Sequence, residues 1–213
     1  MKTITQHINE RLQLNRDRVH KYQPKTKEKL VEIIDDIIKQ HKDDKVIDLN
    51  MIDTSNIDDM AELFSRKKYN YDISQWDVSN VKDMTAMFAY SAFNNDISQW
   101  DVSRVNYMRC MFENSPFNQD ISQWNVSHVK DMSNMFYGCS FNKDISRWDV
   151  SNVEYMTQMF AHSKFNNDIS SWDISHVENM SYIFNKSKFN QNLLPWVNKI
   201  YHTSLLKYIS KYI

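Results

Sequence analysis

Aspartate recurs at fixed intervals of the chain, and carboxylates in a row are the residues best suited to do chemistry here. One column comprises Asp77, Asp101, Asn125, Asp149 and Asp173, and a second comprises Asp48, Asp72, Asp96, Asp120, Asp144 and Asp168. Such columns could hold a cation or a basic partner. Neighbouring charges ~4.8 Å apart repel by roughly 0.9 kcal/mol even in water, so bare carboxylates would be costly. The alternative is that each Asp bonds backbone N–H groups of its own turn.

Other candidate groups for catalysis or metal binding are few. His128 and His176 share a column but stand two repeats apart, about 10 Å, which is too far for two ligands of one zinc ion. Cys110 and Cys139 fall in different columns and are expected to be packed thiols. The chain has no nucleophile elbow, P-loop or H-E-x-x-H motif, and no D-x-D-x-D-G calcium loop. We therefore expect no enzyme, no catalytic residue, no metal and no cofactor.

The elements that must position these columns are set by an internal repeat. A 24-residue unit reads F-N-x-D-I-S-x-W-D-V-S-x-V-x-x-M-x-x-M-F-x-x-S-x, and it runs without insertion from about residue 45 to residue 196. All six tryptophans keep this step: Trp76, Trp100, Trp124, Trp148, Trp172 and Trp196. A single unit cannot bury its apolar side, whereas stacked units bury a continuous core.

Two periodicities lie inside each unit. Ile73, Trp76 and Val78 follow the L-x-x-L-x-L spacing that predicts a short strand. The apolar residues that follow step at i, i+3, i+6 and i+7, which indicates a short helix. They are Val81, Met84, Met87 and Phe88. The predicted fold class is therefore α/β: a leucine-rich-repeat solenoid with one short strand and one short helix per 24-residue repeat. The Asn after each Phe is expected to form a buried hydrogen-bonding ladder.

The two ends of the array read as helical caps. Residues 26–42 and 203–213 each place apolar residues on one helical face, which would cover the terminal core. The alternative is that one of them docks in a partner's groove. The predicted organisation has three parts: an N-terminal arm and helical cap at 1–44, a solenoid of six to seven units at 45–196, and a C-terminal helical cap at 197–213.

The motif W-D-V-S-N-V-x-x-M-x-x-M-F after F-N-x-D-I-S resembles the BspA-type leucine-rich-repeat surface proteins of bacteria. The resemblance covers about residues 45–196. The lead-in KYQPKTKEKLVEIIDDII is similar to the N-terminal cap of stand-alone members from gut bacteria and their phages. The family implies a leucine-rich solenoid that serves adhesion and protein binding, without catalysis. Unlike the surface members, this sequence begins without a recognisable signal peptide.

Charge is near balance overall but unevenly distributed. The chain has 26 Lys and Arg against 27 Asp and Glu, which disfavours a nucleic-acid binder. Residues 1–27 carry a net +5, residues 179–213 a net +5, and the middle a net −11. Basic ends on an acidic body could promote self-association. No stretch approaches the ~20 apolar residues of a membrane span. A cytoplasmic or virion-associated location is expected, with a surface location only by non-classical export.

The sequence predicts a non-catalytic module that recognises a protein of unknown identity through its solenoid surface. The predicted binding residues on the concave strand face are Gln75, Asp77, Gln99, Asp101, Gln123, Asn125, Arg147, Asp149 and Asp173. A weaker set on the helix side comprises Arg104, Tyr107, Arg109 and Tyr155. The alternatives are a structural, self-associating component of a virion or surface assembly, and an exported surface adhesin.

Overall fold

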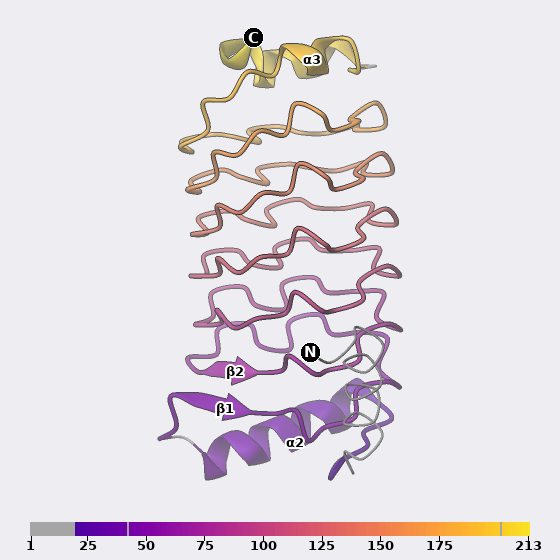
Figure 1. Cartoon of the computed structure of the whole chain (residues 1–213), viewed down its shortest axis with the longest axis vertical. Coiled ribbons are helices and arrows are strands. Elements are labelled where there is room, and N and C mark those ends of the chain that lie inside the picture. Colours follow the sequence, from indigo (N-terminus) through magenta and orange to yellow (C-terminus); the bar gives the residue numbers. More distant parts are fainter. Residues whose placement is uncertain (1–19, 42, 201) are drawn as a thin grey trace, which may run out of the picture.

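The computed structural model describes residues 20–41, 43–200 and 202–213, which form a stack of similar coils with a helix across one end (Figure 1). Two short strands, β1 and β2, pair in parallel with Val46 opposite Asn70 and Asp48 opposite Asp72. In chain order the regular elements are α2 (Lys27–Gln40), β1 (Val46–Asp48), β2 (Asn70–Asp72), α3 (Leu194–Val197), η1 (Thr203–Tyr208) and η2 (Ser210–Tyr212). The last two are 3₁₀ helices.

The predicted α/β leucine-rich solenoid is wrong. Between β2 and α3 the described chain contains neither helix nor strand; each coil is a series of turns joined to its neighbours by single parallel bridges. The predicted strand at Ile73–Val78 and the predicted helix at Val81–Phe88 both lie in this irregular part. The apolar spacing of the unit places side chains in the core, but it does so without a regular element in each repeat.

The hydrogen bonds of one coil explain why no helix forms. The N–H groups of Met84, Ala86, Phe88 and Tyr90 donate to carbonyls of the next coil at 2.7–2.9 Å. Of the N–H groups between them, those of Met87 and Ala89 donate three residues back, at 3.2 and 3.1 Å, and that of Thr85 donates to the Asp83 side chain at 2.8 Å. An α-helix would need every N–H to donate four residues back. In this alternating pattern, half of the N–H groups instead donate to carbonyls of the next coil.

Left-handed backbone makes this alternation possible. Ala86 has φ 52° and Tyr90 has φ 57°, and the equivalent positions of other coils behave alike. The other non-glycine residues with positive φ are Glu62, Arg66, Cys110, Asn114, Asn134, Gln158, His162, Tyr182 and Lys186. A non-glycine residue pays roughly 1–2 kcal/mol for this conformation. The bonds to the next coil must offset that cost in every repeat.

Aromatic ladders fill the core. Phe88 stacks on Phe112 of the next coil with ring centroids 5.6 Å apart, and on Phe93 of its own turn at 3.9 Å. Each tryptophan is buried, and its indole N–H reaches back 27 residues; that of Trp124 donates to the Ile97 carbonyl at 3.1 Å. Because this bond joins one coil to the coil before it, the Trp column fixes the register of the stack.

The asparagine ladder exists, but it is not buried. The side-chain oxygen of Asn94 accepts from the backbone N–H of Asn118 at 2.9 Å, and Asn118 does the same for Asn142. Asn118 is half-buried and Asn142 is exposed. The expectation that this ladder is buried is therefore wrong, because the hydrogen bonds of the asparagine side chains lie at half-buried and exposed positions of the stack.

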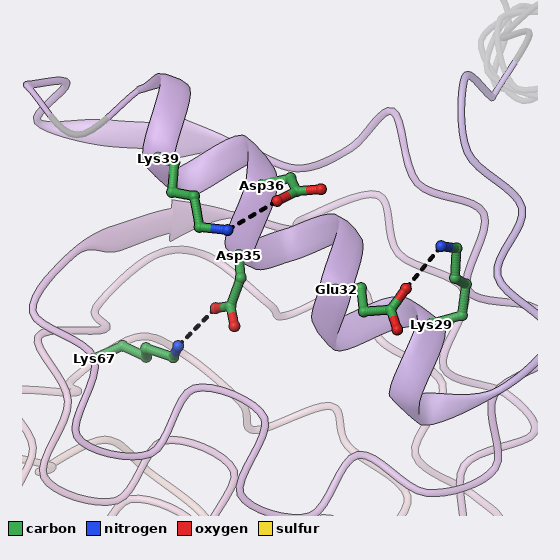
Figure 2. A network of polar contacts seen from close by, with 6 residues as sticks. All are labelled: Lys29, Glu32, Asp35, Asp36, Lys39 and Lys67. Carbon is green, nitrogen blue, oxygen red and sulfur yellow. Dashed lines mark hydrogen bonds and ion pairs between the residues drawn. The ribbon is translucent and has the colours of Figure 1, made fainter.

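The N-terminal helix is present where the sequence predicted it. Thr26 caps α2 by accepting from the Lys29 N–H, and the helix buries Leu30, Ile34 and Ile37 against the first coil. Figure 2 shows Lys67 of the coil paired with the carboxylate of Asp35 on α2, at 2.8 Å. Two further pairs, Lys29–Glu32 and Lys39–Asp36, lie within the helix.

The C-terminal segment differs from the helix that its apolar spacing predicted. It folds as η1 and η2, which bury Leu205, Ile209 and Tyr212 but leave Ile213 53% exposed. Residues 1–19 of the predicted N-terminal arm lie outside the described residues. The boundaries 1–44, 45–196 and 197–213 stay predictions.

Candidate binding surface

The predicted polar columns meet at a hollow on the surface of the stack. Gln75, Asp77, Gln99 and Asp101 line it together, at the turns after Ile73 and Ile97, and its volume is about 430 Å³. All four side chains are exposed. They stand on turns, so the expected strand-lined face is corrected to a face of stacked turns.

Each Asp of this column is held by its own turn. Asp77 Oδ1 accepts from the Ser79 N–H at 3.0 Å and from the Ser79 hydroxyl at 2.6 Å, while Asp101 Oδ1 accepts from the Ser103 N–H at 3.0 Å. Asn125 accepts the same two bonds from Ser127. This is the turn chemistry that the sequence offered as the alternative to ligand binding. One oxygen of each carboxylate is thereby used, and the described residues give Oδ2 of Asp77 and Asp101 no hydrogen bond.

These hydrogen bonds favour the ionised form of two carboxylates in the column, Asp101 and Asp173. The Ser103 hydroxyl and N–H hold the pKa of Asp101 below its usual value. The Ser175 N–H and hydroxyl, with weaker help from Lys199, do the same for the pKa of Asp173. Asp101 and Asp173 therefore carry negative charge at neutral pH, and Asn125 contributes a neutral amide to the column.

A second hollow of about 330 Å³ follows along the stack. It is lined by Gln123 and Arg147 from the predicted set, together with Asp120, Ser122, Lys143 and Asp144. Backbone donation from Ser146 lowers the pKa of Asp144. The repeat comparison of the sequence missed Lys143, although it stands where four other repeats carry Asn or Gln, and that difference is a usable signal. Asn125, Asp149 and Asp173 are exposed in the same column but line neither hollow.

The second predicted set lies on turns, and its two tyrosines form bridges between coils, which corrects its assignment to a helix side. Tyr107 and Tyr155 each bridge the coils on both sides and are 46% and 38% exposed. The Tyr155 hydroxyl donates to Glu178 at 2.8 Å, which raises the pKa of Tyr155. Arg104 donates to the side-chain oxygen of Asn80 at 2.9 Å, and Arg109 is exposed. Neither hollow of the Asp column includes these four residues.

A third hollow of about 400 Å³ was not predicted. The residues that line it are Asn106, His128, Lys130, Asn152, Glu154, His176 and Glu178. Lys130 pairs with Glu154 of the next coil at 3.3 Å. The signal was present in the sequence, because one repeat position changes from basic or neutral to acidic along the stack: Lys82, Asn106, Lys130, Glu154 and Glu178.

Metal-ligand chemistry and thiol chemistry depend on the grouping of the His, Cys, Asp and Glu side chains and on the state of the two cysteines. Among residues 20–41, 43–200 and 202–213, no three His, Cys, Asp or Glu side chains come together as a metal site. Burial raises the pKa of the Cys110 thiol to about 11, and it also raises the pKa of the buried Cys139. Both thiols are therefore protonated at neutral pH, the less nucleophilic form.

The stacked coils define the chain as a repeat protein. The family described as "Mycoplasma protein of unknown function, DUF285" matches residues 34–140 and 113–207, and the chain belongs to this family. The match agrees, at the level of a repeat family, with the resemblance to BspA-like proteins. No match was found among curated proteins or among solved structures.

In the part of the chain that the structure describes, every helix is too short or too polar to cross a lipid bilayer.

Proposed function

We propose that this chain is a non-catalytic recognition module that binds a protein through the exposed turns bearing the first Asp column. The 24-residue motif F-N-x-D-I-S-x-W-D-V-S would be the unit that displays this surface. Its partner would carry basic side chains opposite the Asp column and hydrogen-bonding groups opposite the glutamines beside it.

One observation carries the proposal: consecutive coils bring Gln75, Asp77, Gln99 and Asp101 to the same hollow of about 430 Å³. The turn holds each carboxylate through one oxygen, so the exposed carboxylate is already oriented before a partner binds. Preorganised charged acceptors lose little freedom on binding, which favours specific contact with Arg or Lys. The turns that present them rest on a continuous aromatic core and keep a constant spacing.

The test is affinity capture followed by a direct binding measurement with purified partner. A variant with Asn at Asp77, Asp101, Asp149 and Asp173 should stay folded, because natural Asn125 makes the same turn bonds. It should lose the partner that the wild-type chain retains. A matched control places Asn at Asp48, Asp72, Asp96 and Asp168 of the second Asp column, which accept from their own turns and do not line the hollow. The control changes net charge equally and should keep the partner.

Equal loss in both variants would mean that net charge and not this column attracts the partner. Retention by both, with each variant folded, would leave the Asp column as turn scaffold and remove the proposed function.

A further inference from the structure

The last coil of the stack ends on unused backbone donors. In the coil before it, the N–H groups of Gln158 and Phe160 donate to the carbonyls of Ser181 and Ile183 at 2.9 Å. The equivalent N–H groups of the last coil belong to Met180, Tyr182, Phe184 and Lys186, and the described residues give them no hydrogen bond. The chain 24 residues further on forms η1 rather than another coil. Its carbonyl groups therefore do not lie where the N–H groups of the last coil would find acceptors.

At these four positions the edge offers donors. The carbonyls of Met180, Tyr182 and Phe184 already accept from N–H groups three residues ahead in their own coil. A group that binds to these N–H groups must therefore be an acceptor, such as a peptide carbonyl or a carboxylate.

A hollow of about 500 Å³ lies between this edge and the terminal 3₁₀ segment, which crosses the end of the stack (Figure 1). Its walls are Tyr182, Phe184 and Asn185 from the coil, and Lys207, Tyr208, Ser210, Lys211 and Tyr212 from the cap. Tyr182 is 61% exposed, the most of any large apolar or aromatic side chain in the described residues.

The charge of the hollow has one sign. Lys207 and Lys211 both line it, and residues 179–213 contain five lysines and no Asp or Glu. The ammonium group of Lys211 lies 4.5 Å from the centre of the Tyr212 ring, and that of Lys207 lies 4.8 Å from the Tyr208 ring. No ion pair is formed by either lysine within the described residues. Both ammonium groups thus lie in the wall of the hollow, and their charges remain available to a ligand.

One buried polar atom in the same wall has no partner. Tyr212 is 8% exposed, packs edge-on against Phe184 and Phe189, and its hydroxyl makes no hydrogen bond. A buried hydroxyl without a partner is unfavourable by roughly 1–3 kcal/mol. The wall of the hollow therefore contains an unsatisfied polar group as well as the two lysines.

We propose that the hollow binds an extended acidic segment of another protein. Its backbone carbonyls accept from the N–H groups of Tyr182 and Phe184, and its carboxylates pair with Lys207 and Lys211. Tyr182 and Tyr208 contact its apolar side chains. Main-chain donors then give affinity, as when a peptide adds to a sheet edge, and the lysines select acidic sequence. This site lies at the end of the stack and does not depend on the proposed recognition through the Asp column.

The probe is a capped heptapeptide of alternating Glu and Val, titrated into the full chain and followed by ¹H–¹⁵N NMR. We expect saturable binding with downfield shifts of the Tyr182 and Phe184 amide protons. The double variant Lys207→Gln/Lys211→Gln should weaken binding about tenfold or more, because each lysine contributes a charge-assisted hydrogen bond. The control Lys68→Gln/Lys164→Gln removes the same charge from exposed sites outside the hollow and should change binding less than about twofold.

Three results would overturn the proposal. The first is equal binding of the same peptide with Gln in place of Glu, which would exclude acidic specificity. The second is equal weakening by both lysine pairs, or shifts spread over the whole chain, which would mean unspecific charge attraction. The third is a concentration-dependent dimer without peptide that the Lys207→Gln/Lys211→Gln variant abolishes, since a second copy would then be the occupant.

Discussion

Single residues shape each coil through two kinds of turn. Asp or Asn accepts from the N–H two residues ahead, as Asp101 does from Ser103, and a left-handed residue redirects the chain, as Ala86 does at φ 52°. The chain has one glycine, Gly138, which occupies a left-handed position with φ 62°. Side-chain acceptors and strained backbone thus take the place that glycine has in many turns.

Ala86→Gly should stabilise the protein by about 0.5–1 kcal/mol. Glycine adopts positive φ without the steric cost that alanine pays, and this gain exceeds the added freedom of the unfolded chain. Urea unfolding followed by circular dichroism measures the change in the free energy of unfolding.

The matched control is Ala92→Gly, an exposed alanine that is not among the left-handed residues. It should destabilise the protein by roughly 0.5–1 kcal/mol. If Ala86→Gly destabilised the protein as much as Ala92→Gly does, the left-handed turn would be wrong and a helix at this position would regain support.

Acid should destabilise the chain through its turn aspartates. Hydrogen bonds lower the folded-state pKa values of Asp101, Asp120, Asp144 and Asp173 below those of the unfolded chain. Their contribution is therefore complete above the unfolded pKa of about 3.9, and it is lost as the pH falls through the lower folded values. Melting temperatures measured between about pH 6 and pH 2 should fall most steeply below about pH 4.

Two substitutions test that this loss comes from the turns. Asp101→Asn keeps the acceptor but cannot be protonated in this range, so it should flatten the pH dependence. Asn125→Asp adds a carboxylate beside Ser127 and should steepen it. Identical pH profiles for both variants and the wild type would assign the acid sensitivity to other groups.

At the scale of elements, the sequence predicted helix α2 correctly and the short helix of each repeat wrongly. Residues 27–40 bury an uninterrupted helical face and carry a threonine cap, so local and tertiary preferences agree. The spacing of Val81, Met84, Met87 and Phe88 imitates a helical face, but their coil bonds to its neighbours at every second N–H. Periodicity reports which side chains are inside and does not report whether the backbone bonds within a unit or between units.

The candidate site was predictable in the same partial way. The repeat placed Gln75, Asp77, Gln99 and Asp101 in columns, and the structure brings these four to one hollow. The repeat pattern could not show that Lys143 joins Arg147 in a second hollow, because this depends on the path of the backbone through the turns. Nor could it locate the C-terminal hollow, which exists because η1 fails to continue the ladder.

Helix α2 should stabilise the stack by burial rather than by its ion pairs. Ile34 is 1% exposed, so Ile34→Ala should destabilise the protein by about 2–5 kcal/mol through lost burial and a residual cavity. Lys67→Ala removes the ion pair with Asp35. Because the Lys67 and Asp35 side chains are 36% and 43% exposed, this change should lower the free energy of unfolding by less than about 1 kcal/mol. Chemical denaturation of both variants checks the ratio, and equal costs would make the ion pair an essential clamp.

At the scale of the whole molecule, each coil depends mainly on its two neighbours. The Trp124 indole reaches the coil before it, at Ile97, and the N–H groups of Phe112 and Asn114 reach the coil after it, at Met135 and Tyr137. Stability in such an array is close to a sum over units and interfaces. In the part of the chain that the structure describes, α2 packs on the first coil and the terminal 3₁₀ segment packs on the last coil.

Removal of one whole repeat should therefore leave a folded protein. Deleting residues 117–140 joins Pro116 to Phe141 and lets the Trp148 indole meet the Ile97 carbonyl in place of that of Ile121. Unfolding should stay cooperative at a lower melting temperature, with a denaturant m-value reduced by about one tenth, since m scales with the surface exposed. Deleting residues 117–128 removes half a repeat, breaks the alignment of every ladder, and should unfold the chain. Circular dichroism and size-exclusion chromatography separate the two outcomes: a folded half-repeat deletion would show that the 24-residue register does not hold the stack together.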